Sequence, residues 1–251
     1  MFNFKALRVA PPPAKVAYNK GLRGFTLAEV LVTLGIIGVV SAITVPTLMQ
    51  NYQRTSYVTQ LHKVYNEMSQ AAVQFQTDRN AVNLREAGLN NSLENGYNFI
   101  KSYFKIVSDC EDSFTPCMAE NYKKMDGTNI SLSRVHNIHK CITIASGASI
   151  CIYKGVGNIL NQFAVDINGQ NGPNIAGRDL FMMYIYNDGT VDDLRTTCNE
   201  DNSECGIWDG SENPPTQEER EDVFEKACKG SNTLFHGCFG KILNDNWEMT
   251  Y

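Results

Sequence analysis

Two hydrophobic patterns follow one another between residues 25 and 75. The apolar run from Phe25 to Met49 carries a single charge, Glu29, and is long enough to cross a bilayer as a helix. From Tyr57 to Phe75 the apolar side chains recur at intervals of three and four, which predicts an amphipathic helix with one covered face. We therefore expect one continuous helix over residues 25–77.

The pattern changes after that helix. Residues 80–98 are rich in Asn and Gly and should end it, and residues 97–107 predict a short second helix. Residues 141–153, CITIASGASICIY, alternate like two strands around a three-residue loop that ends in Gly147. Further strands are predicted at 162–167, 180–187 and 190–194.

Near the C-terminus the capping-box pattern Thr216-x-x-Glu219 should open a helix that runs to about Lys229. These elements together predict an α+β fold, in which a long N-terminal helix packs on a small antiparallel sheet with disulfide-stapled loops. Four segments follow: a leader at 1–24, a membrane helix at 25–53, its amphipathic continuation at 54–79 and a globular head at 80–251.

Charge separates the leader from the rest. Residues 1–24 hold five basic residues and no acidic one, so the formal net charge of −5 becomes −10 once they are removed. Such an acidic remainder argues against nucleic acid as a partner. Basic residues before a first membrane segment keep that end in the cytoplasm, which predicts a single-pass protein with its head outside.

Eight cysteines lie beyond residue 109, and no two form a CxxC pair. An even number of cysteines in an exported segment favours disulfides, with buried thiols as the alternative. Cys141 and Cys151 should face each other across the predicted hairpin. The same preference for neighbours in sequence pairs Cys110 with Cys117, Cys198 with Cys205, and Cys228 with Cys238.

Three interpretations of the N-terminus compete: a secretory signal cut after the apolar run, an uncleaved anchor, and a leader cut before the run. Val40-Ser41-Ala42 has the small residues of a signal-peptidase site, so residues 1–42 suit an ordinary signal peptide. That interpretation leaves Glu29 unexplained, because a carboxylate in a membrane segment costs about 3 kcal/mol to insert and usually has a partner.

The segment Lys20-Gly21-Leu22-Arg23-Gly24-Phe25-Thr26-Leu27-Ala28-Glu29 resembles the cleavage motif of type IV prepilins. The resemblance implies that a prepilin peptidase cuts between Gly24 and Phe25 and that the new amine of Phe25 is methylated. It also implies that Glu29 pairs with the Phe25 amine of a neighbouring subunit, and that Gly38 and Pro46 bound a stretch that can lose helicity in the filament.

By this resemblance the chain would be a structural subunit of a type IV pilus or, alternatively, a pseudopilin of a type II secretion system. Its partners would be other pilin-like subunits, the prepilin peptidase and methyltransferase, an assembly platform and membrane lipid. It would reside in the bacterial inner membrane and then in a periplasmic or cell-surface filament. A secreted binding or hydrolytic protein remains the alternative from a different class.

Oxygen-bearing residues gather in the stretch 166–179, where Asp166, Asn168, Asn171 and Asp179 predict a calcium site. The EF-hand spacing is not met, and the alternative is a tight loop whose Asn and Asp side chains bind their own backbone. The sequence VDINGQNGPN with GRDLF after it resembles a loop of type II secretion pseudopilins and related proteins, some of which bind calcium. No other cofactor is expected.

Enzymatic residues are not evident. His136 and His139 lack the glutamate of a HExxH zinc motif and are interpreted as solvated polar residues. No GxSxG elbow occurs, and a Cys–His pair would require one of the predicted disulfide cysteines to be free. The sequence therefore predicts a protein that is not an enzyme.

Overall fold

A computed structural model of the protein describes residues 24–134, 138–198, 205–207, 213–230 and 235–251. The chain divides into two compact units, Met1–Leu48 and Met49–Tyr251. Helix α1, Leu27–Asp78, supplies all but residues 24–26 of the described part of the first unit and continues into the second. The predicted continuous helix is confirmed to within two residues at its start.

The second unit is built around a six-stranded antiparallel sheet in the order β1-β4-β5-β6-β7-β8. Its strands are β1 (Ile106–Glu111), β4 (Lys140–Ile144), β5 (Ser149–Val156), β6 (Ile159–Asp166), β7 (Leu180–Tyr186) and β8 (Val191–Asp192). Four of the five pairings join neighbours along the chain, as a meander of hairpins requires. The predicted α+β class is confirmed.

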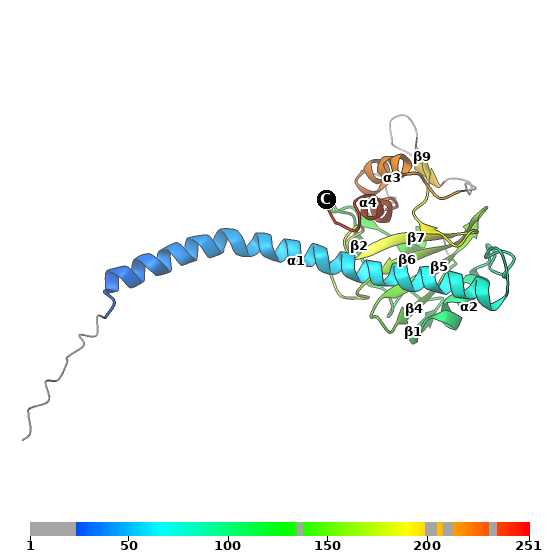
Figure 1. Ribbon diagram of the computed structural model, residues 1–251, viewed down its shortest axis with the longest axis horizontal. Helices are drawn as coiled ribbons and strands as arrows, with labels where there is room; N and C mark the ends of the chain where they lie inside the picture. Colours follow the sequence, from blue (N-terminus) through cyan, green and yellow to red (C-terminus); the bar gives the residue numbers. More distant parts are fainter. Residues whose placement is uncertain (1–23, 135–137, 199–204, 208–212, 231–234) are drawn as a thin grey trace, which may run out of the picture. The chain divides into compact units, whose positions relative to one another are not determined.

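Helix α1 covers one face of this sheet, as Figure 1 shows for its cyan portion. The predicted stripe is the buried face of the helix, formed by Val58, Leu61, Val64, Met68, Ala71, Ala72 and Phe75. These side chains pack on alternate residues of the strands, such as Ile150 and Ile152 of β5. The burial explains why the helix keeps its apolar period as far as Phe75.

A second core lies on the opposite face of the sheet. It contains the other residues of the same strands, including Cys151 and Tyr153 of β5 and Tyr184 of β7, together with Met118 and Leu132 from the segment before β4. Because both faces are covered, β6 and β7 are buried at every position. The two-layer arrangement expected from the sequence is thus extended by a third layer.

Shorter elements complete the second unit. They are α2 (Leu93–Tyr103), β2 (Tyr122–Lys123), β3 (Asn129–Ile130), η1 (Leu132–Arg134), β9 (Thr196–Cys198), β10 (Cys205–Ile207), α3 (Gln217–Val223), η2 (Phe224–Cys228) and α4 (Cys238–Asn244). The predicted helix at 97–107 is displaced toward the N-terminus. Ser92 caps α2 by accepting from the Asn95 N–H, and residues after Tyr103 pair with β4 instead.

Three disulfides have the predicted partners: Cys110–Cys117, Cys141–Cys151 and Cys228–Cys238. Cys141 lies directly opposite Cys151 in the β4–β5 register. Cys198 and Cys205 are likewise opposite each other in the β9–β10 ladder, but their side chains lie outside the described structure. The bond between those two therefore stays a prediction.

Buried charged groups fix the C-terminal elements to the sheet. Arg220 of α3 binds the carboxylate of Asp192 on β8 through two of its guanidinium nitrogens. The Asp193 carboxylate accepts from the Gly237 and Gly240 N–H groups, at 3.1 and 2.9 Å, and so caps the first turn of α4. Gly237 has a φ of 85°, which a residue with a side chain adopts at a cost.

Candidate processing and assembly segment

The start of α1 is a capping box closed by Glu29. The Thr26 N–H and hydroxyl both donate to Glu29 Oε2 at 2.8 Å, and the Glu29 N–H donates back to Thr26 Oγ1 at 3.2 Å. This reciprocal pattern satisfies donors that a helix start otherwise leaves unpaired. The carboxylate also lies at the positive end of the helix dipole, which favours negative charge.

The sequence resemblance implies a partner for Glu29 only in a neighbouring subunit, whereas the structure adds one in its own chain. The spacing Thr26-x-x-Glu29 is the same capping-box signature that predicts the start of α3. Two hydrogen bonds and the helix dipole lower the cost of holding this carboxylate near hydrocarbon. The Glu29 carboxylate therefore has hydrogen-bond partners within a single chain.

The predicted cleavage site, the Gly24–Phe25 bond, lies at the start of the described structure. Residues 1–23 of the leader lie outside the described structure, and Gly24 is the first residue within it. Gly24 has open space around it, since an added Cβ would meet no atom within 4 Å. Phe25, which would become the new N-terminus, is 87% exposed. The Gly24–Phe25 bond is thus unobstructed by the described chain, while cleavage there stays a prediction.

The apolar residues of α1 before Met49 lie on all sides of the helix and are exposed, from 40% at Val30 to 77% at Leu27. Among the described residues one helix, α1, is long and apolar enough to cross a membrane, with a mean hydropathy of 2.2 in its best 18-residue window. None of that window is buried within the protein. This surface needs hydrocarbon or other helices around it.

Gly38 and Pro46 both lie inside α1, which runs through them without interruption. Pro46 has no N–H to donate, so the carbonyl four residues earlier loses its helical partner. Nearby hydroxyls bind other carbonyls in this stretch, as Thr44 does to Val40 at 2.9 Å. The helix is therefore weakened here but intact in the unassembled chain, and its loss of order in a filament stays a prediction.

The predicted calcium ligands occupy the loop between β6 and β7. Asp166 is fully buried and accepts from the Tyr122 hydroxyl at 2.5 Å and from the Asn168 N–H at 3.1 Å. Burial, with help from the charge of Asp179, raises the pKa of Asp166 to about 7. Asp179 is also buried and accepts from the Asn174 and Ile175 N–H groups, and its pKa is raised by the same desolvation.

These contacts favour the tight-loop alternative in part. Asn171 donates to the Asn168 carbonyl at 2.8 Å, as a loop-stabilising side chain would. Yet the side-chain oxygens of Asn168 and Asn174 are buried and accept no hydrogen bond within the described structure. No group of three or more His, Cys, Asp and Glu residues that could hold a metal occurs among the described residues. Calcium binding through Asp166, Asn168, Asn171 and Asp179 stays a prediction.

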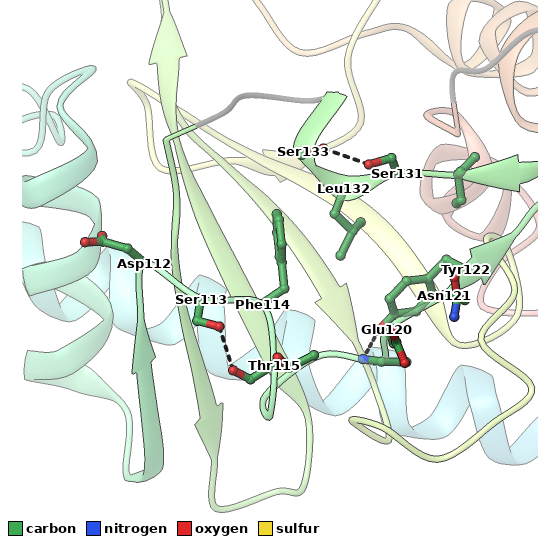
Figure 2. Close-up of a pocket in the computed structure, with 12 residues that line it drawn as sticks. Asp112, Ser113, Phe114, Thr115, Glu120, Asn121, Tyr122, Ser131, Leu132 and Ser133 are labelled. Atoms are coloured by element: carbon green, nitrogen blue, oxygen red, sulfur yellow. Dashed lines mark hydrogen bonds between the residues drawn. The ribbon is translucent and has the colours of Figure 1, made fainter.

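A pocket of about 490 Å³ opens on the head beside Phe114, Tyr122 and Leu132 (Figure 2). Several of its polar groups are engaged with the protein. Ser131 and Ser133 share a hydrogen bond, Ser113 donates to the Thr115 carbonyl, and Tyr122 donates to Asp166. The lining, which lies wholly within the described chain, includes no histidine or cysteine.

One of the two histidines was assigned the wrong environment from the sequence. His139 is 7% exposed, and its ring stacks on Phe114 at 3.7 Å between centroids. The Phe114 ring gives the flat face of the His139 ring an apolar surface to pack on, and this packing explains why His139 is buried. His136 lies outside the described residues.

Comparison with known proteins finds a known motif in the N-terminal segment. Residues 19–45 match a family model described as the prokaryotic N-terminal methylation motif. No curated protein and no solved structure matches the chain. The chain thus carries the methylation motif of type IV pilin-like precursors at the start of its long apolar helix, which indicates a structural protein processed by a prepilin peptidase.

Proposed function

From that motif and the membrane-length helix behind it, we propose that the chain is the precursor of a type IV pilus subunit. The prepilin peptidase cuts between Gly24 and Phe25, the Phe25 amine is methylated, and the apolar part of α1 then packs into a filament core. The observation that carries this proposal is the combination of the motif at residues 19–45 with an apolar surface exposed on every side.

The capping box provides partners for the Glu29 carboxylate before the subunits assemble. Before cleavage the Phe25 nitrogen is an amide and offers no positive charge, so Thr26 provides the partners of Glu29. Cleavage creates an ammonium group on Phe25, and an ammonium of a neighbouring subunit then competes for the same carboxylate. Such a charge pair is worth far more in a low-dielectric helix bundle than in water, so it selects the axial register of the subunits.

Two substitutions separate the charge of Glu29 from its capping role. Glu29→Gln retains a side-chain oxygen that can accept from the Thr26 N–H but has no charge, whereas Glu29→Val removes both. We expect both variants to insert in the membrane and to be processed, and neither to enter filaments. The measurement is the amount of each variant in sheared or detergent-extracted filaments relative to total membrane protein. Normal incorporation of Glu29→Gln would contradict charge pairing.

A matched pair of threonine variants tests the cap itself. Thr26→Val removes the hydroxyl that bonds Glu29, and Thr33→Val removes one that bonds only the Val30 carbonyl at 3.0 Å. We expect Thr26→Val to lower the membrane-inserted amount of the uncleaved precursor, while Thr33→Val leaves it unchanged. Equal amounts in the two variants would assign the cap no role before assembly.

The mature N-terminus distinguishes the remaining alternatives. Mass spectrometry of the exported chain should find methylated Phe25, whereas a terminus at Ile43 would identify a secreted protein with an ordinary signal peptide. A filament on the cell surface supports the pilus subunit. Chains that stay in the periplasm, with secretion lost when the gene is deleted, would instead support the type II secretion pseudopilin.

A further inference from the structure

A groove of about 400 Å³ lies where α1 joins the head. It is lined by residues from the first turns of the head portion of α1 and from the C-terminal segment: Asn51, Arg54, Thr55, Val58, Thr59, Trp247, Glu248 and Met249. All of them belong to the unit that begins at Met49. The groove therefore belongs to one compact part of the chain and does not depend on how the two units are arranged.

The backbone is strained where it delivers Trp247 to this groove. Asn246 and Trp247 have φ angles of 52° and 64°, and a bulky residue in that region is held there only by its surroundings. The Trp247 ring stacks on His62 of α1 at 3.9 Å between centroids and lies 4.9 Å from the Tyr65 ring. The indole is thereby fixed against α1 and only partly buried, so it also contributes to the groove.

Two opposite charges line the groove without internal partners. Arg54 makes no ion pair within the described chain, and its Nε–H is buried with no hydrogen-bond acceptor there. Glu248 is exposed and likewise has no side-chain partner among the described residues. A buried donor left without an acceptor costs more than a hydrogen bond contributes, so Arg54 points to an acceptor supplied from outside the chain.

Position along the helix identifies what surrounds the groove. The uncharged stretch from Val30 to Met49 spans about 30 Å at 1.5 Å per residue, the thickness of a bilayer hydrocarbon core. Arg54 comes shortly after this stretch in the sequence, so lipid headgroups lie within its reach when the stretch spans a bilayer. Tyr52, which is 76% exposed, and Trp247 are the aromatic residues that favour this interface.

We propose that the groove binds the headgroup of a zwitterionic phospholipid of the phosphoethanolamine type. The phosphate accepts from the Arg54 guanidinium, whose planar fork suits phosphate oxygens, and the primary ammonium donates to Glu248. Trp247 lies against the glycerol region. The inference rests on the proposed function only in requiring that the chain be anchored in the membrane. The bound lipid would hold the head at the membrane surface, and filament assembly would have to break this contact.

The test uses the full chain with Trp208→Phe, because Trp208 and Trp247 are its two tryptophans. The protein is reconstituted in phosphatidylcholine vesicles that contain phosphatidylethanolamine, with one lipid or the other brominated near the top of its acyl chains. Quenching of Trp247 fluorescence then reports which lipid occupies the groove. We expect roughly tenfold preference for phosphatidylethanolamine, since a quaternary ammonium cannot donate to Glu248.

Variants assign the preference to the two charges. Glu248→Gln should abolish the preference between the two lipids, and Arg54→Gln should weaken quenching by both. Lys63→Gln serves as the matched control, because Lys63 is an exposed cation of α1 outside the groove. This control should behave as the parent protein does.

Several results would overturn the inference. Equal quenching by both lipids in the parent protein would do so, as would an absence of quenching while the chain resists extraction by alkaline carbonate, which leaves membrane anchoring intact. Shielding of Trp247 that occurs only in assembled filaments would show that a neighbouring subunit fills the groove. Extraction of the chain by carbonate would refute the anchor and with it the proposed function.

Discussion

The two parts of this chain treat similar apolar side chains in opposite ways. Before Met49, the Leu, Ile and Val residues of α1 are at least 40% exposed, as with Leu31 at 61% and Ile43 at 70%. In the unit that begins at Met49 most residues of these types are buried, as with Leu61 and Ile152 at 0%. The two parts of α1 thus suit different surroundings. The second part is covered by the sheet, whereas the apolar side chains of the first part are covered only if lipid or other subunits surround them.

The difference also appears in how polar groups are satisfied. The N-terminal part relies on contacts three or four residues apart, such as Thr26 with Glu29 and Thr44 with Val40. The head adds contacts across long sequence distances, such as the Asp193 carboxylate with the Gly240 N–H. A helix with no protein packed around it can use only contacts within itself, whereas the head can use contacts made by its tertiary fold.

The largest effect is expected from a change that stops the first part from becoming a filament element. Gly24→Glu places a charged, larger side chain at the predicted cleavage site and should abolish processing, leaving the 251-residue precursor in the membrane. Mass spectrometry of the intact protein measures the outcome. The head should retain its disulfides and unfolding transition, because none of its described contacts involves Gly24. A processed variant would disprove the cleavage position.

The next effect concerns the buried carboxylate of the head. Burial raises the pKa of Asp166 to about 7, so protonation favours the folded state. Its contribution to stability is fully present below the unfolded pKa of about 4 and is lost as the pH rises through about 7, by roughly 4 kcal/mol. Asp166→Asn should remove that loss, because an amide does not titrate in this range. The new amide nitrogen can face the Tyr122 hydroxyl, which can accept, so the contact between the two side chains is kept.

Chemical denaturation of the full chain in detergent at several pH values measures this dependence. The difference between parent and variant isolates Asp166 from other titrating groups. One of these is His236, whose pKa burial lowers to about 4, so that it lowers stability as the pH falls. Parallel pH profiles of the two proteins would contradict the assignment.

A smaller loss is expected when the hairpin disulfide is removed. Cys141→Ser with Cys151→Ser opens a loop of 10 residues, which the chain-entropy estimate values at about 3 kcal/mol of unfolding free energy. Denaturation under the same conditions should show that loss, and the yield of membrane-inserted protein should not change. The comparison between the two parts fails if insertion falls together with head stability.

The smallest effect is expected from calcium. If the loop of Asp166 and Asp179 binds the ion, calcium should raise the unfolding temperature of the head by a few degrees relative to chelator, since a ligand of the native state stabilises it by mass action. Asp166→Asn should abolish the shift, and Glu120→Gln, a change at an exposed acid outside the loop, should keep it. An unfolding temperature of the parent protein that calcium leaves unchanged would contradict calcium binding by this loop.

Local sequence was sufficient wherever the structural cause is local. The stripe from Val58 to Phe75 predicts the covered face of α1, because helix period alone decides which side chains share a face. The alternation around Gly147 predicts the β4–β5 hairpin and places Cys141 opposite Cys151. The start of α3 follows from Thr216 and Glu219, whose capping box is present in the structure. The N-terminal motif is of the same kind, since all its residues are contiguous.

What only the tertiary structure decided are contacts between residues far apart in sequence. No local pattern shows that a third layer covers the sheet, that Asp193 caps α4, or that Trp247 stacks on His62. Each depends on two segments that the folded sheet brings together. Bringing them together costs conformational entropy, which the burial of apolar side chains offsets. Sequence period therefore determined the elements of this protein, and long-range packing determined where its polar groups and its groove lie.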